Sequence, residues 1–501
     1  MARNLNLISA TPSVFGHIRR FPGSARRLYV RGPDSFTNLS IYGFGVSGLW
    51  TSVDTILLQF RVLEFADEDQ KNGMLGAITL VGLVIAAATQ PIAGAISDRS
   101  KTRWGKRLPY IVMGNLGLLV MTPFLGFANS FITLLLVIVM MQLFGNISQG
   151  PANALLMDHI PRHRRGVGAG ALNLSRASGA GAVTVVVLLL MSQSGDDGAD
   201  SGWYWASLGV VVTVLFFSMT WTAGALRPRR SHVSRTDVDD RFAETASAAA
   251  IPLIPIIPVV IPVGTDPGES GSVISTTASH SKPGAALRHA TGFYWFLLAM
   301  AMVVASLSAM QTFALFFIRD KVGLENPATG AAALTLSVGL GAAIAVYPSG
   351  AASDRFGRMP VLYIASVIAG SSAILLLLVS SITHLVILGA FIGIGAAMFL
   401  SSGLALVTEL VPPNAAARSL GLTALATLIG SGLARISGFG IDALNRRSDG
   451  LGYDFLIVGM ATLLILSLFP LRRAGIGLAR SRRVAETSES ASPERPPTPS
   501  V

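Results

Sequence analysis

The chain has no cysteine and few charged residues, and both shortages restrict what it can be. Without cysteine there is no disulfide framework and no thiolate metal or redox site. Only 13% of the 501 residues are charged and 8% are aromatic, whereas 51% are hydrophobic and 52 are glycine. This balance is typical of a protein that crosses the membrane several times rather than of a large soluble enzyme.

Sequence motifs of several enzyme classes are missing as well. The chain has no G-x-x-x-x-G-K-[ST] phosphate loop, no H-E-x-x-H helix and no G-x-S-x-G turn. We therefore expect neither an ATP-driven pump nor a membrane-embedded enzyme, and we expect no cofactor and no metal site.

Basic residues exceed acidic ones, with 38 Lys and Arg against 27 Asp and Glu and a net charge of +11. The excess lies in short turns and at the termini, where it sets membrane orientation, so we do not expect nucleic-acid binding. Residues 1–37 are Arg-rich and lack an apolar core before a cleavage site. They are interpreted as a cytoplasmic tail and not as a signal peptide.

Two segments are nearly the same: residues 94–99 read GAISDR and residues 350–355 read GAASDR. Each ends an apolar run and is followed by a glycine, basic residues and a proline, at 105–109 and 357–360. The repeat indicates a duplicated chain. Two halves of this kind are typical of transporters whose repeats rock against each other around a central site.

Twelve stretches reach the length of about 20 apolar residues that crossing the hydrocarbon core requires. They are approximately 39–63, 73–97, 108–127, 131–156, 166–192, 203–224, 292–318, 328–352, 360–380, 384–411, 418–441 and 453–471. Basic turns follow spans 2, 4, 6, 8 and 12, whereas acidic or neutral turns follow spans 1, 3 and 5. This alternation predicts a multi-pass plasma-membrane protein with both termini in the cytoplasm. Arg446 and Arg447, after span 11, are the exception.

The predicted fold is an all-α integral membrane protein with twelve transmembrane helices in two pseudo-symmetric six-helix halves. The halves are expected at 38–224 and 291–472, joined by a cytoplasmic linker over 225–290 and followed by a disordered cytoplasmic tail at 473–501. The linker contains an apolar, proline-rich run at 251–262. Its prolines forbid a regular helix and it is too short to cross, so we expect it to rest on the membrane or on the protein.

Three further patterns support a family resemblance. Residues 90–111 read QPIxGxxSDRxxxRxGKRxPYI, residues 146–158 read NxxQGPxxALLxD, and residues 42–45 read YGFG. With the paired G-x-x-S-D-R turns, these patterns resemble the major facilitator superfamily over about residues 38–475. Within that superfamily they are similar to the sucrose-type proton symporters and the glycoside–cation symporters.

The resemblance implies roles for the charged residues of the repeated turns. Asp98 and Asp354 are expected to meet helix N-termini of the opposite half and to pair with Arg418 and Arg165 when the cytoplasmic side is closed. The matching pairs inside each half are Asp158 with Arg99 and Glu409 with Arg355. We call these eight residues the latch; the alternative is that they only end helices and set topology.

Polar residues inside the spans predict the solute path. Gln142, Asn146, Gln149 and Asn153 follow offsets of 4, 7 and 11, so they share one helical face. This amide stripe faces either a cavity, where amides suit a poly-hydroxyl solute, or another helix as a hydrogen-bonded seam. Superfamily proteins use helices 1, 4, 7 and 10 around the site. The further predicted solute contacts are Trp50 in span 1 and Gln311 in span 7.

Three ionisable residues lie inside predicted spans: Asp54, Arg176 and Arg435. A charge in hydrocarbon costs at least ~2.5–3.5 kcal/mol, so each is expected to pair, face water or serve transport. Since spans 1 and 5 are neighbours in the superfamily, we expect Asp54 to pair with Arg176. A structural ion pair without a transport role is the alternative.

The chain also departs from its relatives. Sodium-using glycoside–cation symporters have acidic residues where this chain has Ala86, Gln90 and Gln149, so a sodium site is not expected. Trp50 replaces their sugar-binding aspartate, although its ring can stack on a pyranose. Asp54 is therefore the predicted proton carrier, and uniport remains open.

Together these features predict a monomeric secondary transporter in the lipid bilayer, which moves a sugar or similar small polar solute with protons by alternating access. Fold alone does not decide the substrate. A drug or metabolite efflux pump on the same fold is one alternative, and a transport-dead membrane receptor is another.

Overall fold

The structure is a computed structural model that describes residues 36–100, 102, 104–159, 165–194, 202–225, 283–410 and 416–476. Every regular element in these ranges is helical, without a strand. Twelve helical segments are long and apolar enough to cross a membrane. The predicted all-α class and the twelve spans are confirmed.

The first half contains six spans, two of which change helix type along their length. The first span is a continuous run of α2 (Phe36–Ser52), the π-helical turn η2 (Val53–Leu57) and α3 (Leu58–Phe65). The others are α4 (Lys71–Arg99), α5 (Leu108–Met121) with η3 (Thr122–Phe127), α6 (Phe131–His159), α7 (Arg165–Met191) and α8 (Gly202–Ala225).

The second half repeats this plan. It contains α10 (Pro283–Phe317) with the π-helical turn η6 (Ile318–Val322), α11 (Pro327–Phe356), α12 (Arg358–Leu375) with η7 (Leu376–Leu378), α13 (Ile382–Leu410), α14 (Ala416–Asn445) and α15 (Leu451–Leu466). Helix α10 begins at Pro283, inside the range expected for the linker. The apolar run at 251–262 and residues 1–35 and 477–501 of the two predicted tails lie outside the described residues. Residues 36–37 and 473–476, which were assigned to the tails, are helical, because the first and last helices extend beyond the predicted spans.

Local sequence explains where several of these helices begin and end. Asn326 caps α11 by accepting a hydrogen bond of 3.1 Å from the backbone N–H of Thr329, and Pro327 occupies the first turn, where a missing N–H costs nothing. Gly357 separates α11 from α12 with a φ of 90°, a left-handed conformation that favours glycine. The turn after α11 is therefore a single residue.

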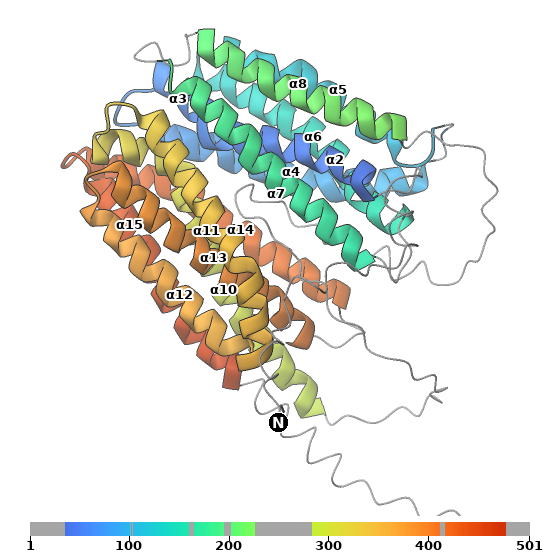
Figure 1. Cartoon of the computed structure of the whole chain (residues 1–501), viewed down its shortest axis with the longest axis vertical. Helices are drawn as coiled ribbons and strands as arrows, with labels where there is room; N and C mark the ends of the chain where they lie inside the picture. Colours follow the sequence, from blue (N-terminus) through green and yellow to red (C-terminus); the bar gives the residue numbers. More distant parts are fainter. Residues whose placement is uncertain are drawn as a thin grey trace, which may run out of the picture.

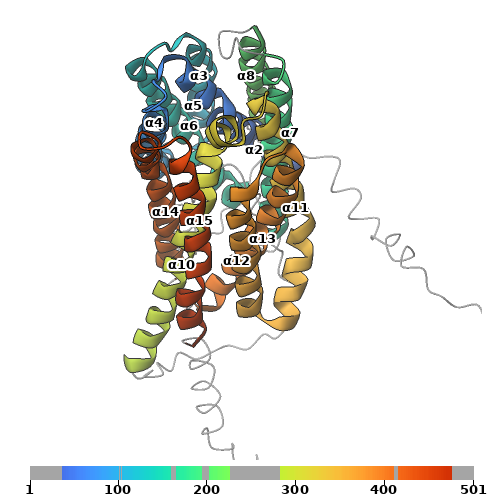
Figure 2. The same ribbon diagram turned by 90° about the vertical axis from the view of Figure 1, so that its left-hand side faces the viewer.

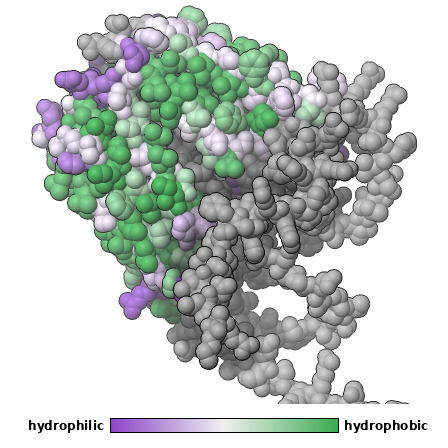
Figure 3. Space-filling view, viewed as in Figure 1, coloured by the Kyte–Doolittle hydropathy of each residue, from purple (hydrophilic) through white to green (hydrophobic). Residues whose placement is uncertain are grey.

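The helices form two bundles, which Figure 1 shows in blue to green and in yellow to red. The bundles meet most extensively where α4 contacts α14 and α7 contacts α11, and α10 also contacts η2 and α4 (Figure 2). Large apolar side chains such as Ile344 and Phe217 are exposed on the flanks. Figure 3 shows this hydrophobic flank, with hydrophilic residues gathered near its ends. In lipid such a surface carries no penalty.

The contacts between the bundles concentrate toward one end. We call it the Glu68 end, which holds the turns at 66–70, 323–326 and 446–450; the opposite end is the Arg99 end. A Cβ on Gly76 would overlap the carbonyl oxygen of Arg435, and one on Gly438 would overlap that of Asn72. Helices α4 and α14 are therefore antiparallel and touch through glycines. One apolar core, with Leu75 and Phe313 among its members, spans both bundles.

Candidate functional site

A cavity of about 680 Å³ lies between the two bundles. Its wall is formed by α2, η2, α4, α6 and α7 of the first half and by α11 and α14 of the second. This size suits a small solute, since ligand sites usually have volumes of about 300–1,000 Å³.

Most of the residues predicted to face the solute line this cavity. They are Trp50, Asp54, Gln142, Asn146, Gln149, Arg176 and Arg435. Asn153 does not line the cavity, but it forms a hydrogen bond to Arg176, which does line it. Gln311 on α10 is 9% exposed and is not among the lining residues, so the structure does not support its predicted contact with solute.

Asp54 lies in the π-helical turn η2, where the first span departs from regular α-helix. Such turns are often found at functional sites. The Gln59 side chain donates hydrogen bonds of 3.2 Å to the backbone oxygen of Asp54 and of 3.0 Å to that of Thr312 on α10. The amide thereby ties the turn to the second half. The Asp54 carboxylate lines the cavity, and within the described residues it accepts no hydrogen bond.

The predicted pairing of Asp54 with Arg176 is wrong in this structure. No ion pair joins them within the described residues. The other cation of the cavity wall is Arg435 on α14, in the opposite half, and its Nη1 donates to the Ser431 backbone oxygen at 3.0 Å. Arg176 instead donates a hydrogen bond of 2.5 Å from Nη2 to the Asn153 side-chain oxygen. Its stem fits against Gly43, where an added Cβ would lie 2.9 Å from the Arg176 Cγ.

The amide stripe divides between the two expected roles. Asn146 Nδ2 donates to the Gln142 side-chain oxygen at 3.1 Å and to its backbone oxygen at 2.8 Å. Asn153 forms the bridge from α6 to α7 just described. Gln149 lines the cavity and makes no hydrogen bond to the described residues, so its amide is available to a solute.

Trp50 adds an apolar surface and a donor to the same wall. Its ring lies against Gly145, where an added Cβ would be 2.7 Å from Trp50 Cζ2. Its Nε1 is buried and makes no hydrogen bond within the described residues. Since buried donors are normally satisfied, an unpaired one at a cavity wall indicates a ligand or water as its partner.

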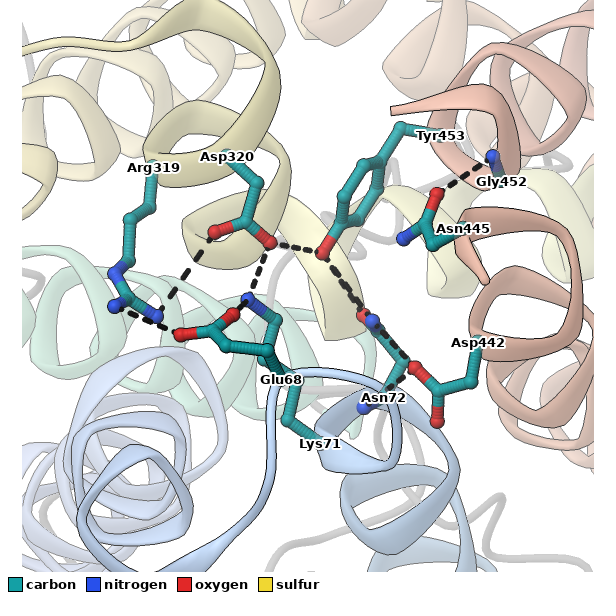
Figure 4. A network of polar contacts seen from close by, with 9 residues as sticks. All are labelled: Glu68, Lys71, Asn72, Arg319, Asp320, Asp442, Asn445, Gly452 and Tyr453. Carbon is teal, nitrogen blue, oxygen red and sulfur yellow. Dashed lines mark hydrogen bonds and ion pairs between the residues drawn. The ribbon is translucent and has the colours of Figure 1, made fainter. Parts of the chain in front are cut away.

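A second polar cluster, shown in Figure 4, joins the halves at the Glu68 end. We call it the interdomain network; it contains Glu68, Lys71, Asn72, Arg319, Asp320, Asp442 and Tyr453. Lys71 Nζ, on α4, lies 2.6 Å from Asp320 Oδ2 on η6 and also pairs with Glu68. Arg319 Nη2 lies 3.0 Å from Glu68 Oε1. Lys71 is only 2% exposed, so its charge depends on these carboxylates.

Within this network, Asp442 of α14 caps α4 across the boundary between the halves. Its Oδ2 accepts a hydrogen bond of 2.5 Å from the backbone N–H of Gly73, and its Oδ1 accepts one of 3.2 Å from that of Asn72. Tyr453 donates to Asp320 Oδ2 at 2.5 Å. Nearby, Arg446 Nη1 donates to the Asp69 backbone oxygen at 3.2 Å. The basic residue that broke the charge alternation therefore binds the other half.

Charge pairing acts on Glu68, which lies outside the spans. Partial burial opposes ionisation of its carboxyl group, but the hydrogen bond and charge of Lys71 and the charge of Arg319 outweigh it and lower the pKa of Glu68. None of the contacts of this network was predicted from the sequence. Charged residues flank the first and seventh spans; those after the first span were used only to predict topology, and those after the seventh were not considered.

At the Arg99 end, the two repeated turns differ in length but have matching side-chain contacts. Asp98 pairs with Arg107, which donates to Ser97 Oγ at 2.9 Å, and Arg358 pairs with Asp354 and donates to Ser353 Oγ at 3.0 Å. Arg99 and Arg355 are exposed. The side chains of the remaining latch residues lie outside the described part of the chain: Asp158, Arg165, Glu409 and Arg418. The latch therefore stays a prediction.

Comparisons with known proteins agree with this architecture. Residues 43–248 match the family described as MFS/sugar transport protein, and residues 296–496 match the Major Facilitator Superfamily. An uncharacterized symporter of Synechocystis sp. is 32% identical over 81 residues, which is 16% of this chain and 14% of that protein.

Solved structures show the same fold. A bacterial homologue of the human lysosomal transporter Spinster, in an inward-facing and unoccupied conformation, has a TM-score of 0.55 at 17% identity, covering 91% of this chain and 98% of that one. Its inward-facing, occupied form gives 0.53 at 18% identity, covering 95% and 100%. With a family match in each half, twelve membrane-length helices and this fold, the chain belongs to the major facilitator superfamily of transporters.

Proposed function

We propose that the protein carries a sugar or a similar small polar solute together with protons. The observation that carries the proposal is the cavity shared by the two halves, where the Trp50 indole N–H, the Gln149 amide and the Asp54 carboxylate have no hydrogen-bond partner within the described residues. These groups offer donors and acceptors to hydroxyl groups, and the Trp50 ring offers a stacking face. The family matched by the first half includes sugar transport in its description.

Alternating access follows from the uneven contacts between the halves. The interdomain network closes the Glu68 end, whereas the acids of the repeated turns pair within their own half at the Arg99 end. The basic turns assign the Arg99 end to the cytoplasm of a plasma-membrane protein. The conformation is then closed to the outside, and transport by a single copy requires the network to break as the latch forms.

Proton coupling is assigned to Asp54 and Arg435. The two charges come from opposite halves and face the same cavity. An ionised Asp54 attracts Arg435 and holds the halves together, and protonation removes that attraction. Proton binding thereby changes the energy difference between the two access states, which is what coupling requires.

The direct test is uptake into proteoliposomes. Labelled mono- and disaccharides are offered with and without an imposed pH gradient, and accumulation above equilibrium is expected only with the gradient. Asp54→Asn should abolish accumulation while preserving exchange, because exchange can run with the site permanently neutral. Accumulation by Asp54→Asn equal to that of the parent would rule out Asp54 as the carrier.

Two other functions remain on the same fold. An efflux pump for apolar compounds would bind such compounds in the same assay and would neither bind nor transport saccharides. A receptor without transport would bind solute but show no flux. The unpaired polar groups of the cavity favour transport of a polar solute over efflux of apolar compounds. The interdomain network joins the halves through ion pairs and hydrogen bonds that a rocking motion could break, which favours a transporter over a receptor.

A further inference from the structure

The charges that face the cavity do not balance. Its lining includes two arginines, Arg176 and Arg435, but one acidic residue, Asp54. With all three ionised, the wall carries a formal charge of +1, which is two positive groups minus one negative group. A neutral solute leaves this excess uncompensated in a region of low dielectric.

The excess charge belongs to Arg176. Arg435 faces Asp54 across the cavity and donates from Nη1 to the Ser431 backbone oxygen at 3.0 Å, without an ion pair to Asp54 within the described residues. The hydrogen-bond partner of Arg176 is the neutral amide of Asn153, 2.5 Å away, so Arg176 has no carboxylate partner on its own side of the cavity. The neighbouring Tyr42 hydroxyl is shared with Ser148 at 2.5 Å and supplies no formal charge. No ion pair to Arg176 occurs within the described residues. Since an unpaired charge within the membrane is costly, its retention at a cavity wall indicates a ligand of opposite charge.

The remaining donors indicate what kind of anion fits. A guanidinium binds a planar carboxylate through two parallel N–H···O bonds, and one of its nitrogens is already held by Asn153. The Gln149 amide and the Trp50 N–H lie in the same wall, where they can bind hydroxyl groups. An excess of one positive charge matches one carboxylate.

We propose that the transported solute is a polyhydroxylated carboxylate, such as a sugar acid, whose carboxylate binds Arg176. The proposal rests on the proposed function, which assigns this cavity as the solute site. It narrows the class of transported solute from small polar solutes to anionic ones. Asn153 acts as a positioning residue, because it holds the guanidinium without neutralising it.

Protonation strengthens this binding. The charged groups that face Asp54 in the cavity are Arg435 on α14 and Arg176 on α7, while α4, α6 and α11 bring no charged side chain to the wall. The part of α10 from Gly292 to Phe317, which packs against η2, contains none. Protonating Asp54 raises the positive excess from one to two. By linkage, proton and anion then favour each other's binding.

The test compares matched probes on the full-length protein in lipid nanodiscs. D-glucuronate and D-glucose differ by the carboxylate, and binding of each is measured by calorimetry at pH 6 and pH 8. We expect glucuronate to bind at least about tenfold more tightly than glucose, the factor that corresponds to about 1.4 kcal/mol. The preference should be larger at pH 6, because glucose binding lacks the charge linkage.

Two variants locate the effect, and one controls for loss of charge. Arg176→Gln removes the cation, and Asn153→Asp places a carboxylate beside it in a nearly isosteric side chain. Both should abolish the preference for glucuronate while glucose binding persists, and Asn153→Asp keeps the test valid if Arg176→Gln does not fold. Lys321→Gln removes a positive charge from a solvent-facing pair with Asp454, 2.8 Å away, and should leave the preference unchanged.

Each of the other possible results contradicts one specific part of the proposal. Glucose binding that equals or exceeds glucuronate binding overturns the anionic class and leaves the sugar function standing. Binding of neither probe overturns the proposed function. A preference that survives both variants overturns the role of Arg176, and tighter binding of glucose 6-phosphate than of glucuronate overturns the carboxylate.

Discussion

The carboxylate of Asp442, near the end of α14, accepts a hydrogen bond of 2.5 Å from the backbone N–H of Gly73 in the first turn of α4. Helices α4 and α14 are antiparallel and belong to different halves. Asp98 lies at the other end of α4, where the superfamily resemblance predicts a contact with the start of α14. Each helix therefore carries an aspartate near its C-terminus: Asp442 caps α4 in this structure, whereas Asp98 pairs with Arg107 here and is predicted to meet α14 in the opposite access state.

The first prediction concerns this cap. Asp442→Ala removes the acceptor of two N–H groups in the first turn of α4, which have no partner within the helix. Loss of an N-terminal cap costs about 0.5–2 kcal/mol. We expect the Glu68 end to open more often. Because the chain has no cysteine, a single cysteine at the cavity-lining position Leu83 is a clean probe. Labelling by an impermeant thiol reagent applied at the Glu68 end should rise.

The matched control for that experiment is Asp454→Ala. Asp454 lies at the same end but pairs with Lys321 of its own half. Labelling of this variant should equal that of the parent. An equal rise in both variants would show that general loosening, and not the cap, opens this end.

The second prediction concerns the glycine contact between α4 and α14. In Gly76→Ala the new Cβ would overlap the Arg435 carbonyl oxygen, so the helices must separate and the closed state is destabilised. Gly440→Ala on α14 places a Cβ where no atom lies within 4 Å. This variant should change neither the closure of the Glu68 end nor the uptake rate. Thiol labelling at the Glu68 end and uptake rates measure both effects. Normal closure in Gly76→Ala would contradict the close approach of the helices.

The third prediction is a pH dependence of closure through Glu68. Lys71, three residues away in the same half, and Arg319, from the second half, lower the pKa of Glu68, and the part due to Arg319 exists only when the network is formed. The contribution of Glu68 to closure is therefore complete above the ordinary value of about 4.3 and is lost as the pH falls through the lowered pKa. Labelling should be constant near neutral pH and rise in the acidic range below about pH 4.

Glu68→Gln isolates this contribution from other acidic groups. The variant should be more open at pH 7 than the parent, and its labelling should change less on acidification. Asp67→Asn, in the same turn, serves as the control. Identical acid profiles for the parent and Glu68→Gln would show that Glu68 does not stabilise the closed end.

The fourth prediction separates two amides of α6. Gln149 has no hydrogen-bond partner within the described residues, whereas the Gln142 side chain already accepts a bond from Asn146. Loss of one solute hydrogen bond costs about 0.5–1.5 kcal/mol. Gln149→Ala should therefore raise the apparent KM about two- to tenfold, with a smaller effect from Gln142→Ala. Equal KM values accompanied by lower thermal stability in both would favour a structural seam.

Periodicity predicted a large part of the cavity wall. Offsets of 4 and 7 place Gln142, Asn146 and Gln149 on one face of α6, and all three line the cavity. The next member, Asn153, shares that face but binds Arg176 of α7. A helical pattern defines a face, whereas the groups that each part of the face meets depend on the neighbouring helices.

The charge pairs could not be predicted from helical periodicity. Asp54 was expected to pair with Arg176 within the first half, but no ion pair joins them within the described residues, and Arg435 of the second half faces the same cavity. Lys71 and Asp320 are likewise far apart in sequence, and each alone resembles an ordinary residue at the end of a span. Sequence spacing carries no information about the rotation and register of helices from different halves.

The sequence by itself determined the twelve helices, the two halves and the polar face of α6, because hydrophobic length and helical period are local properties. Only the tertiary structure decided that Asp442 caps Gly73, that Asp320 neutralises Lys71 and that Arg176 meets an amide instead of a carboxylate. These contacts depend on how two bundles pack in one access state. That packing is a balance of long-range interactions that the local pattern does not contain.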